Sequence, residues 1–393
     1  MADKTPSIQR AEQVDHQLVR GIGIPALTAN IVSSTIGAGI FVIPATVAAG
    51  LGPAAPLAFI CCAIAMVLFV TCFAIAGSRV SLTGGLYAYV EVAFGKYVGF
   101  LAGILYFLTA LGAVAGVVNV LANSIALVIP FLGGPLMRIV VMLTVYGVLV
   151  LINIRGVREG AGAVTTITVA KLLPLLLFIG VGIFFINPQN LSWPGWPGSK
   201  ALGDSVILLI FAFVGNHKDA PLAEAAARFL GNIGRTILLA GATISAFGFV
   251  TSDILSSPRM IFAFGRDGAL PKWFAHVHPR YRSPDVAIIT YAVLAFALSI
   301  TGTFEKLAVL SNVAVLLMYL LCCAACWFLV QRDVRAHGAQ PFNFPGMKIV
   351  PALAIVAIIW ILAHATAWEF EVNGIVLAVA SVFYFLRAKL RST

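Results

Sequence analysis

Charged side chains are scarce in this chain. Asp, Glu, Lys and Arg make up 10% of its 393 residues and hydrophobic residues make up 61%, whereas a soluble domain averages about 25% charged residues. The mean hydropathy is +1.01. This composition excludes an ordinary soluble domain and indicates a polytopic membrane protein built from α-helices. The long apolar runs also exclude an outer-membrane barrel, whose strands alternate polar and apolar residues.

The sequence also lacks the motifs of an enzyme. The hydrophilic links are short and contain no metal-ligand cluster, no nucleophile–base arrangement and no Gly-Lys-Ser/Thr phosphate loop. Cys322, Cys323 and Cys326 lie in an apolar run, and their neighbours are Leu, Ala and Trp. Small packing residues are a better interpretation of these thiols than a metal site. We therefore expect no catalytic activity, no cofactor and no bound metal.

The net charge of +10 raises the question of a nucleic-acid partner. The basic residues are spread over short links between apolar runs, which is the distribution that the positive-inside rule describes for cytoplasmic loops. We therefore expect no nucleic acid, and we expect both termini to be cytoplasmic. Residues 1–20 are polar and do not form a cleavable signal peptide.

Ten apolar runs are long enough to cross a bilayer, which takes about 20 residues. They are residues 25–48, 55–77, 98–129, 137–154, 161–186, 235–264, 284–302, 305–331, 349–366 and 370–388. Residues 84–96 have the pattern of an amphipathic interfacial helix. The run 203–215 has half the required length, so it either turns back or is followed by a missing segment. The predicted organisation is a tail at 1–24, a transmembrane domain at 25–388 and a tail at 389–393.

The first apolar run contains a predicted helix break. Gly37 and Gly39 weaken the helix there, and Pro44 removes a hydrogen bond. Freed backbone groups are tolerated at membrane depth only where they line a protein cavity. In transporters with broken helices, such amides bind an anionic substrate group and the carbonyls bind a cation. The alternative is a close helix-packing contact.

Several motifs together resemble the amino acid–polyamine–organocation superfamily of permeases. They are Gly37-Ala38-Gly39-Ile40-Phe41 with Pro44, Thr83-Gly84-Gly85-Leu86-Tyr87-Ala88-Tyr89, Lys171, Phe211-Ala212-Phe213-Val214-Gly215, Ser257-Pro258-Arg259 and Arg266-Asp267-Gly268-Ala269-Leu270-Pro271. The resemblance covers nearly the whole chain. It implies an all-α fold with two five-helix inverted repeats, here 25–186 and 203–331, followed by two extra helices at 349–388. The first and sixth helices of this fold are unwound at mid-membrane.

The chain departs from that pattern after Gly215. Related permeases continue with the second half of helix six and with helix seven, whereas here Asn216-His217-Lys218-Asp219 follows at once. About 50–60 residues, which is one and a half spans with their loop, are missing relative to the pattern. The count agrees, because ten spans and a half helix are one and a half fewer than the twelve of the pattern. The second repeat, 203–331, is therefore expected to be incomplete.

The resemblance and the break together predict a substrate site. We expect the segment Ile36, Gly37, Ala38, Gly39 and Ile40 to offer backbone N–H groups to a substrate carboxylate. The resemblance implies that Phe211 and Phe213, before the unwound Gly215, form an aromatic lid; packing is the alternative. It also places Asp253 in the substrate cavity, where it would attract a cationic group or bind a proton. The alternative for Asp253 is a hydrogen bond to a neighbouring helix.

Lys171 is the predicted coupling residue. It is the one basic residue deep in its span, and a charge at that depth is costly and marks a functional site by default. The resemblance implies that its ammonium occupies the place of a sodium ion near the first and eighth helices, with Thr251 and Ser252 supplying hydroxyl groups. The alternatives are a permanent internal cation for Lys171, and bonds from the two hydroxyls to their own backbone.

The sequence thus predicts a secondary active transporter of amino acids or related amines, with alternating access and proton coupling. Its partners are a small-molecule substrate, H⁺ and the lipid bilayer, which we expect to be a bacterial inner membrane. The alternative is a permease-like relic, an accessory subunit or a sensor that does not transport.

Overall fold

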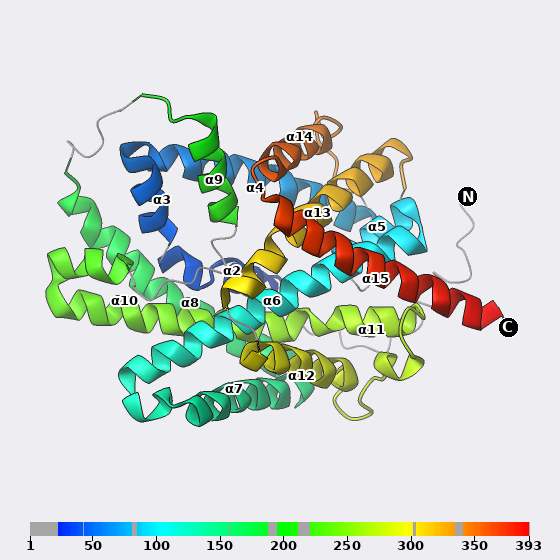
Figure 1. The fold of residues 1–393 in the computed structure, drawn as a ribbon, viewed down its shortest axis with the longest axis horizontal. Helices are drawn as coiled ribbons and strands as arrows, with labels where there is room; N and C mark the ends of the chain where they lie inside the picture. Colours follow the sequence, from blue (N-terminus) through cyan, green and yellow to red (C-terminus); the bar gives the residue numbers. More distant parts are fainter. Residues whose placement is uncertain are drawn as a thin grey trace.

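The computed structural model describes residues 23–41, 43–80, 85–155, 157–187, 195–210, 221–301, 304–334 and 341–392. Within these ranges the regular structure is entirely helical (Figure 1). The α-helices are α2 (Ile24–Thr35), α3 (Ile43–Leu51), α4 (Ala55–Arg79), α5 (Leu86–Phe94), α6 (Lys96–Val128), α7 (Pro135–Arg155), α8 (Val157–Gly182), α9 (Ser199–Ile210), α10 (Pro221–Ser256), α11 (Pro258–Arg266), α12 (Asp285–Thr301), α13 (Phe304–Gln331), α14 (Val350–Leu362) and α15 (Ala367–Ser392).

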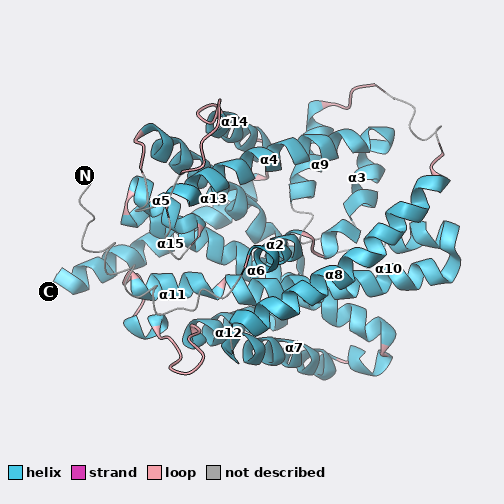
Figure 2. Ribbon diagram, turned by 180° about the vertical axis from the view of Figure 1, so that it is seen from behind, coloured by secondary structure: helices cyan, strands magenta, loops and turns pink. Residues whose placement is uncertain are grey.

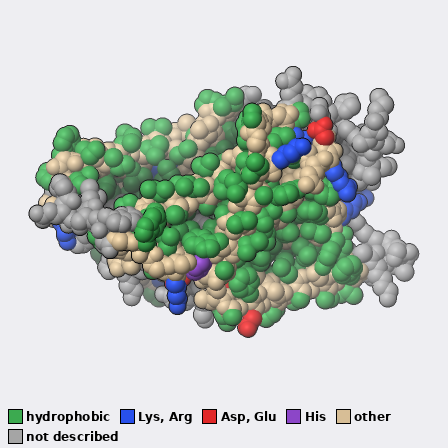
Figure 3. Space-filling model, turned by 90° about the horizontal axis from the view of Figure 1, so that it is seen from above, with side chains coloured by type: hydrophobic (Ala, Val, Ile, Leu, Met, Phe, Trp, Pro, Cys, Tyr) green, Lys and Arg blue, Asp and Glu red, His purple; other side chains and the backbone are tan. Residues whose placement is uncertain are grey.

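The helices confirm an all-α polytopic membrane protein. Among the described residues, seven helices are long and apolar enough to cross a membrane, and α12 and α14 are shorter apolar helices. Apolar side chains cover much of the face seen in Figure 3, and charged side chains there are few. The first predicted span is interrupted and two others are short, so the predicted number of ten full spans stays a prediction.

The first apolar run is broken near its middle. The helix α2 ends at Thr35, and Ile36 has φ −87° and ψ 88°, outside the helical region. A 3₁₀ turn, η1 (Ala38–Phe41), follows Gly37 and leads to α3. Figure 2 shows α2 near the centre of the molecule, where it packs against α8 and α10. The interruption therefore lies among packed helices.

Two apolar cores meet at α6. One is formed largely by α4, α5, α13 and α14, and the other by α6, α7, α10 and α12. Leu105 of α6 belongs to the first core, whereas Val114 and Leu121 belong to the second. Because all three side chains are at most 2% exposed, α6 joins the two halves through its full length.

The four most deeply placed thiols lie where α4 packs against α13. Cys72 comes from α4, and Cys322, Cys323 and Cys326 come from α13; all four are buried in the first core. Cys61 and Cys62 of α4 are partly buried, and all six thiols are free. Among the described residues, no group of three metal-ligating side chains is placed to hold a metal.

The helix α9 and the start of α10 lie on either side of residues 211–220. The helix α9 covers the first part of the predicted half-length run 203–215. Helix α10 contains a kink at Gly231, whose φ of 59° is unfavourable for other residues. The predicted lid residues Phe211 and Phe213, and Gly215, lie outside the described residues.

Arg79 fastens the end of α4 to the chain that follows α13. Its guanidinium group is buried, and it donates to Asp333 Oδ1 at 3.1 Å, to the Val334 carbonyl at 3.2 Å and to Asn343 Oδ1 at 2.9 Å. The Asp333 side chain is 57% exposed. The ion pair with Asp333 therefore contributes little, and the hydrogen bonds from the buried guanidinium group to Val334 and Asn343 account for most of the stabilisation.

We expect Arg79→Met to lower the free energy of unfolding by about 1.5–3 kcal/mol, since hydrogen bonds to a charged group are lost. The measurement is the apparent melting temperature of the detergent-purified protein. Lys272→Met, at an exposed position, is the matched control. Equal melting temperatures for the two variants would contradict the assigned role of Arg79.

Candidate functional site

Lys171 of α8 binds the main chain at the break. Its side chain is fully buried. The Nζ atom donates to the Ser33 carbonyl at 2.8 Å and to the Ile36 carbonyl at 2.5 Å. In an unbroken α-helix each of these carbonyl groups would accept a hydrogen bond from the backbone N–H four residues later. The break removes that donor. The ammonium group therefore replaces the missing backbone donor inside the protein.

Ser245 of α10 completes the set of donors. Its hydroxyl donates to the Gly37 carbonyl at 2.9 Å and lies 3.1 Å from the Ile36 carbonyl. Ser33 in turn donates to the Gly248 carbonyl at 3.1 Å. The broken segment is thus held between α8 and α10 by polar contacts in an otherwise apolar interior.

A glycine allows α10 to approach this closely. A Cβ atom added at Gly248 would lie 2.7 Å from Cγ2 of Ile167, 3.2 Å from Oγ of Ser33 and 3.6 Å from Cδ of Lys171. These distances are too short for ordinary packing on the Ile167 side. The distance between α10 and α8 therefore depends on the absence of a side chain at this position.

Thr251 and Ser252 have different surroundings. Thr251 donates to the Phe247 carbonyl of its own helix at 2.8 Å, which is the alternative that the sequence left open. The Ser252 hydroxyl is fully buried and has no hydrogen-bond partner among the described residues. Ser252 lies one helical turn after Gly248, so it is on the face of α10 that packs toward α8.

The predicted substrate segment is partly enclosed. Gly37 is buried, Ile36 is intermediate and Ile40 is 37% exposed. Ala38 and Gly39 belong to η1, and the first N–H groups of any helix have no partner inside it. The segment therefore has its carbonyls satisfied by side chains, and donors at the start of its short helical turn remain.

The structure places Asp253 apart from this group. Its Oδ1 accepts from the Ser257 hydroxyl at 2.7 Å and its Oδ2 accepts from the Tyr291 hydroxyl. Tyr291 belongs to α12, so the carboxyl group of Asp253 points toward α12 and not toward the broken segment. This is the hydrogen bond to a neighbouring helix that the sequence offered as the alternative to a cavity position.

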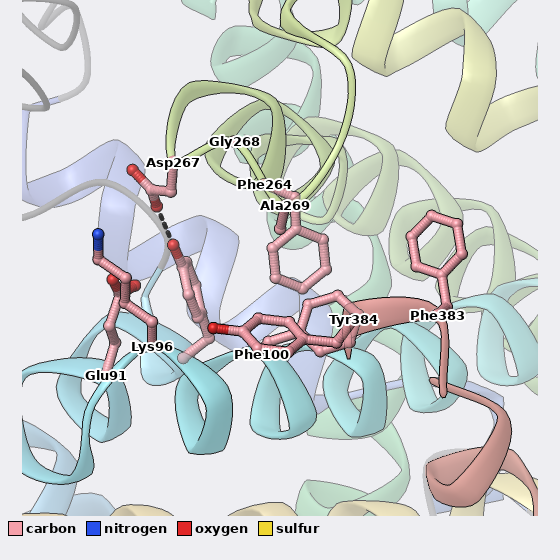
Figure 4. Close-up of a pocket in the computed structure, with 10 residues that line it drawn as sticks. Glu91, Lys96, Phe100, Phe264, Asp267, Gly268, Ala269, Phe383 and Tyr384 are labelled. Atoms are coloured by element: carbon pink, nitrogen blue, oxygen red, sulfur yellow. Dashed lines mark hydrogen bonds between the residues drawn. The ribbon is translucent and has the colours of Figure 1, made fainter. Parts of the chain in front are cut away.

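A separate cavity of about 130 Å³ lies where α5, α6, α11 and α15 meet. Figure 4 shows Glu91, Lys96 and Asp267 on one side and the rings of Phe264, Phe100 and Tyr384 on the other. The Tyr87 hydroxyl donates to Asp267, and Arg266 binds the same carboxylate at 2.7 and 2.9 Å. The ends of α11 and α15 and the helix α5 share one end of the molecule in Figures 1 and 2, so the cavity is remote from the break at α2.

Two titratable groups of α5 are perturbed in this cavity, outside the membrane-spanning segments. Burial and then the negative charge of Asp267 raise the pKa of Glu91 above its usual 4.5. Burial, followed by the nearby carboxylates, also raises the pKa of the Tyr87 phenol. The negative charge of Asp267 therefore adds to burial in opposing the ionisation of Glu91.

The structure brings Lys171 to the broken segment. It also shows two further residues in the hydrogen bonds of this segment that the sequence analysis did not single out. Ser33 and Ser245 are polar residues within apolar runs, and this was the only available signal. Such residues more often bond their own helix. Their role depends on which helix face meets the break, and the sequence pattern does not determine that rotation.

Comparison with known proteins identifies a family. A profile described as amino acid permease matches residues 22–217 and 206–386. The chain is 25% identical to a serine/threonine exchanger from Bacillus subtilis over 404 positions, covering 88% of this chain and 91% of the exchanger. It is 27% identical to a methylthioribose transporter from the same organism, covering 97% of this chain and 96% of that one. A branched-chain amino acid permease of Bacillus subtilis is 24% identical, covering 96% and 95%.

The alignments also show a discontinuity. The match to the methylthioribose transporter spans 446 positions, 53 more than the 393 residues of this chain. Residues of that relative therefore have no counterpart here. The two stretches that match the family profile overlap at residues 206–217, where the sequence departs from the permease pattern.

We expect Gly248→Ala to destabilise the protein by about 1–3 kcal/mol, because the added methyl group overpacks the contact with Ile167. Gly374→Ala is the matched control. That glycine lies in α15 with open space around it, and alanine favours a helix by about 1 kcal/mol over glycine. Thermal unfolding of both variants in detergent measures the difference. A melting temperature for Gly248→Ala at or above that of the control would show that the contact tolerates a side chain.

Glu91 gives a pH-dependent prediction. Because its pKa is raised by folding, the folded chain binds this proton more tightly than the unfolded chain does. Stability is therefore lost as the pH rises from about 4.5 through the raised pKa. We expect Glu91→Gln to raise the melting temperature at pH 7 and to lose this advantage below pH 4.5.

The control for Glu91→Gln is Glu371→Gln, at an exposed position of α15. Melting temperatures are recorded from pH 4 to pH 8 for the three proteins. A stabilisation by Glu91→Gln that is the same at every pH would rule out the titration of Glu91 as its cause.

Proposed function

This chain belongs to the amino acid permease family, and from that membership we propose that it is a secondary active transporter of amino acids or related amines that works by alternating access. It is an integral membrane protein, and its relatives are transporters and not enzymes. The observation that carries the proposal is the buried ammonium group of Lys171 on the carbonyls of a broken transmembrane helix.

The segment from Ile36 to Ile40 is the proposed substrate site. Donors at Gly37, Ala38 and Gly39 suit a carboxylate group, because main-chain N–H groups at a helix break bind anions. The carbonyls on the other side of the break already have partners in Lys171 and Ser245. By the family resemblance, Phe211 and Phe213 close over the substrate beside Gly215.

Lys171 is the proposed coupling residue. A charged ammonium group attracts the Ser33 and Ile36 carbonyls, and a neutral amine attracts them less strongly. A buried lysine loses its proton more readily than an exposed one. Loss of the proton would therefore loosen α8 from the broken helix, and this would connect a proton to the movement of the substrate site.

The proposed architecture has two inverted repeats, 25–186 and 203–331, and two extra helices. In this proposal the protein lies in the plasma membrane of a bacterium, and both of its termini are cytoplasmic. The second repeat lacks the second half of helix six and helix seven. The split family match at residues 206–217 supports this position for the gap.

The gap also supplies the alternative function, which is a permease-like subunit or sensor that binds but does not transport. Intact mass and uptake decide between the two. The purified chain is reconstituted in liposomes and offered a panel of radiolabelled amino acids and amines, with and without an inward proton gradient. At a mass near 41.5 kDa, gradient-stimulated uptake supports transport by the shortened chain, and absence of uptake supports the alternative.

We expect Lys171→Ala to abolish proton-driven uptake while the protein still elutes as one folded species in size-exclusion chromatography, with a lower melting temperature because the Ser33 and Ile36 carbonyls lose a donor. Lys171→Met preserves more of the buried volume and should have the same transport defect. Lys272→Met, an exposed lysine, should transport normally. Proton-driven uptake at the wild-type rate by either Lys171 variant would refute the coupling role.

A further inference from the structure

A second titratable group is enclosed on another face of α10. The Asp253 residue is 8% exposed, and Tyr291 and Ser257, which bind its two carboxyl oxygens, are at most 1% exposed. The hydroxyl of Tyr106, from α6, lies close to Asp253 and Ser257. The carboxyl group of Asp253, on α10, is therefore surrounded by hydroxyl groups from α6, from α12 and from Ser257, the residue between α10 and α11.

No cation faces this carboxyl group in the described part of the chain. Its titratable neighbours on α6, α7 and α12 are Tyr106, Tyr146 and Tyr291. Lys171 of α8 binds main-chain carbonyls instead, and the described residues of α2, η1 and α3 include no titratable side chain. Arg259 of α11 forms no ion pair with Asp253, nor does any other described residue.

An ionised carboxylate at this place would be an uncompensated charge within the membrane span. Such a charge is costly, and membrane proteins pair or neutralise it. A proton is the neutralising cation that this cluster can accept without a structural change. Tyrosine and serine hydroxyls can donate or accept, so the same three groups can bind the carboxylate and the neutral acid.

We propose that Asp253 is a proton-binding site separate from Lys171, with Tyr291 as its positioning residue. The two groups lie at different faces of α10: Ser245 and Gly248 of α10 face Lys171 of α8, whereas Asp253 of α10 faces α6 and α12. Both groups contact α10 or its neighbours without sharing a hydrogen-bond partner. The link to transport rests on the proposed function, whereas the proton site itself does not.

Infrared difference spectroscopy of the purified protein in lipid tests the proposal directly. Spectra of the wild type are compared with those of Asp253→Asn over an acid-to-alkaline titration. We expect a carbonyl-stretch band of a protonated carboxylic acid that disappears as the pH rises and is absent from Asp253→Asn. Asp204→Asn, at an exposed position of α9, should retain the band.

Two further variants keep the test decisive if Asp253→Asn does not fold. Tyr291→Phe should shift the band, because it removes the hydroxyl that binds Oδ2. Lys171→Met should leave the band in place, because the two sites are separate. A wild-type band that does not respond to pH, spectra of Asp253→Asn identical to the wild type, or loss of the band in Lys171→Met would each overturn the proposal. Absence of uptake with the band intact would instead count only against the proposed transport function.

Discussion

The hydrogen bonds from Lys171 to the main chain at the break hold the centre of this molecule together. Inside a membrane, a carbonyl without a partner costs several kcal/mol, and the end of α2 at Thr35 leaves such carbonyls at Ser33, Ile36 and Gly37. One ammonium group and one hydroxyl, from two different helices, bind them. The break is therefore stable only while α8 and α10 remain packed against it.

That requirement makes α10 the element on which both buried titratable groups depend. One of its faces approaches the broken segment at Gly248, and another presents Asp253 to Tyr291 of α12. The helix α6 lies against α10 and α13 and joins the two apolar cores. A displacement of α10 would consequently act on the broken helix, on α12 and on the contact with α6 at the same time.

The sequence predicted the positions of the helices along the chain better than it predicted which face of each helix meets which neighbour. The apolar runs 55–77 and 137–154 agree closely with α4 and α7, because lipid exposure requires continuous apolar sequence there. The Gly37–Gly39 pair marked the break, and the isolation of Lys171 in an apolar run singled out the side chain that binds the main chain there. The direction of Asp253 was not predictable in this way. Successive helical residues differ by about 100°, so Ser252 and Asp253 face different neighbours, and only tertiary packing decides which.

The placement of the thiols has a practical consequence for labelling experiments on this protein. Cys72, Cys322, Cys323 and Cys326 are buried between α4 and α13, and Cys61 and Cys62 lie in the apolar sequence of α4. Water-soluble, membrane-impermeant maleimides react with thiolates that water reaches. A single cysteine introduced beside the helix break would then be the dominant reactive thiol in the otherwise native chain, and its labelling rate would report from which side of the membrane water enters.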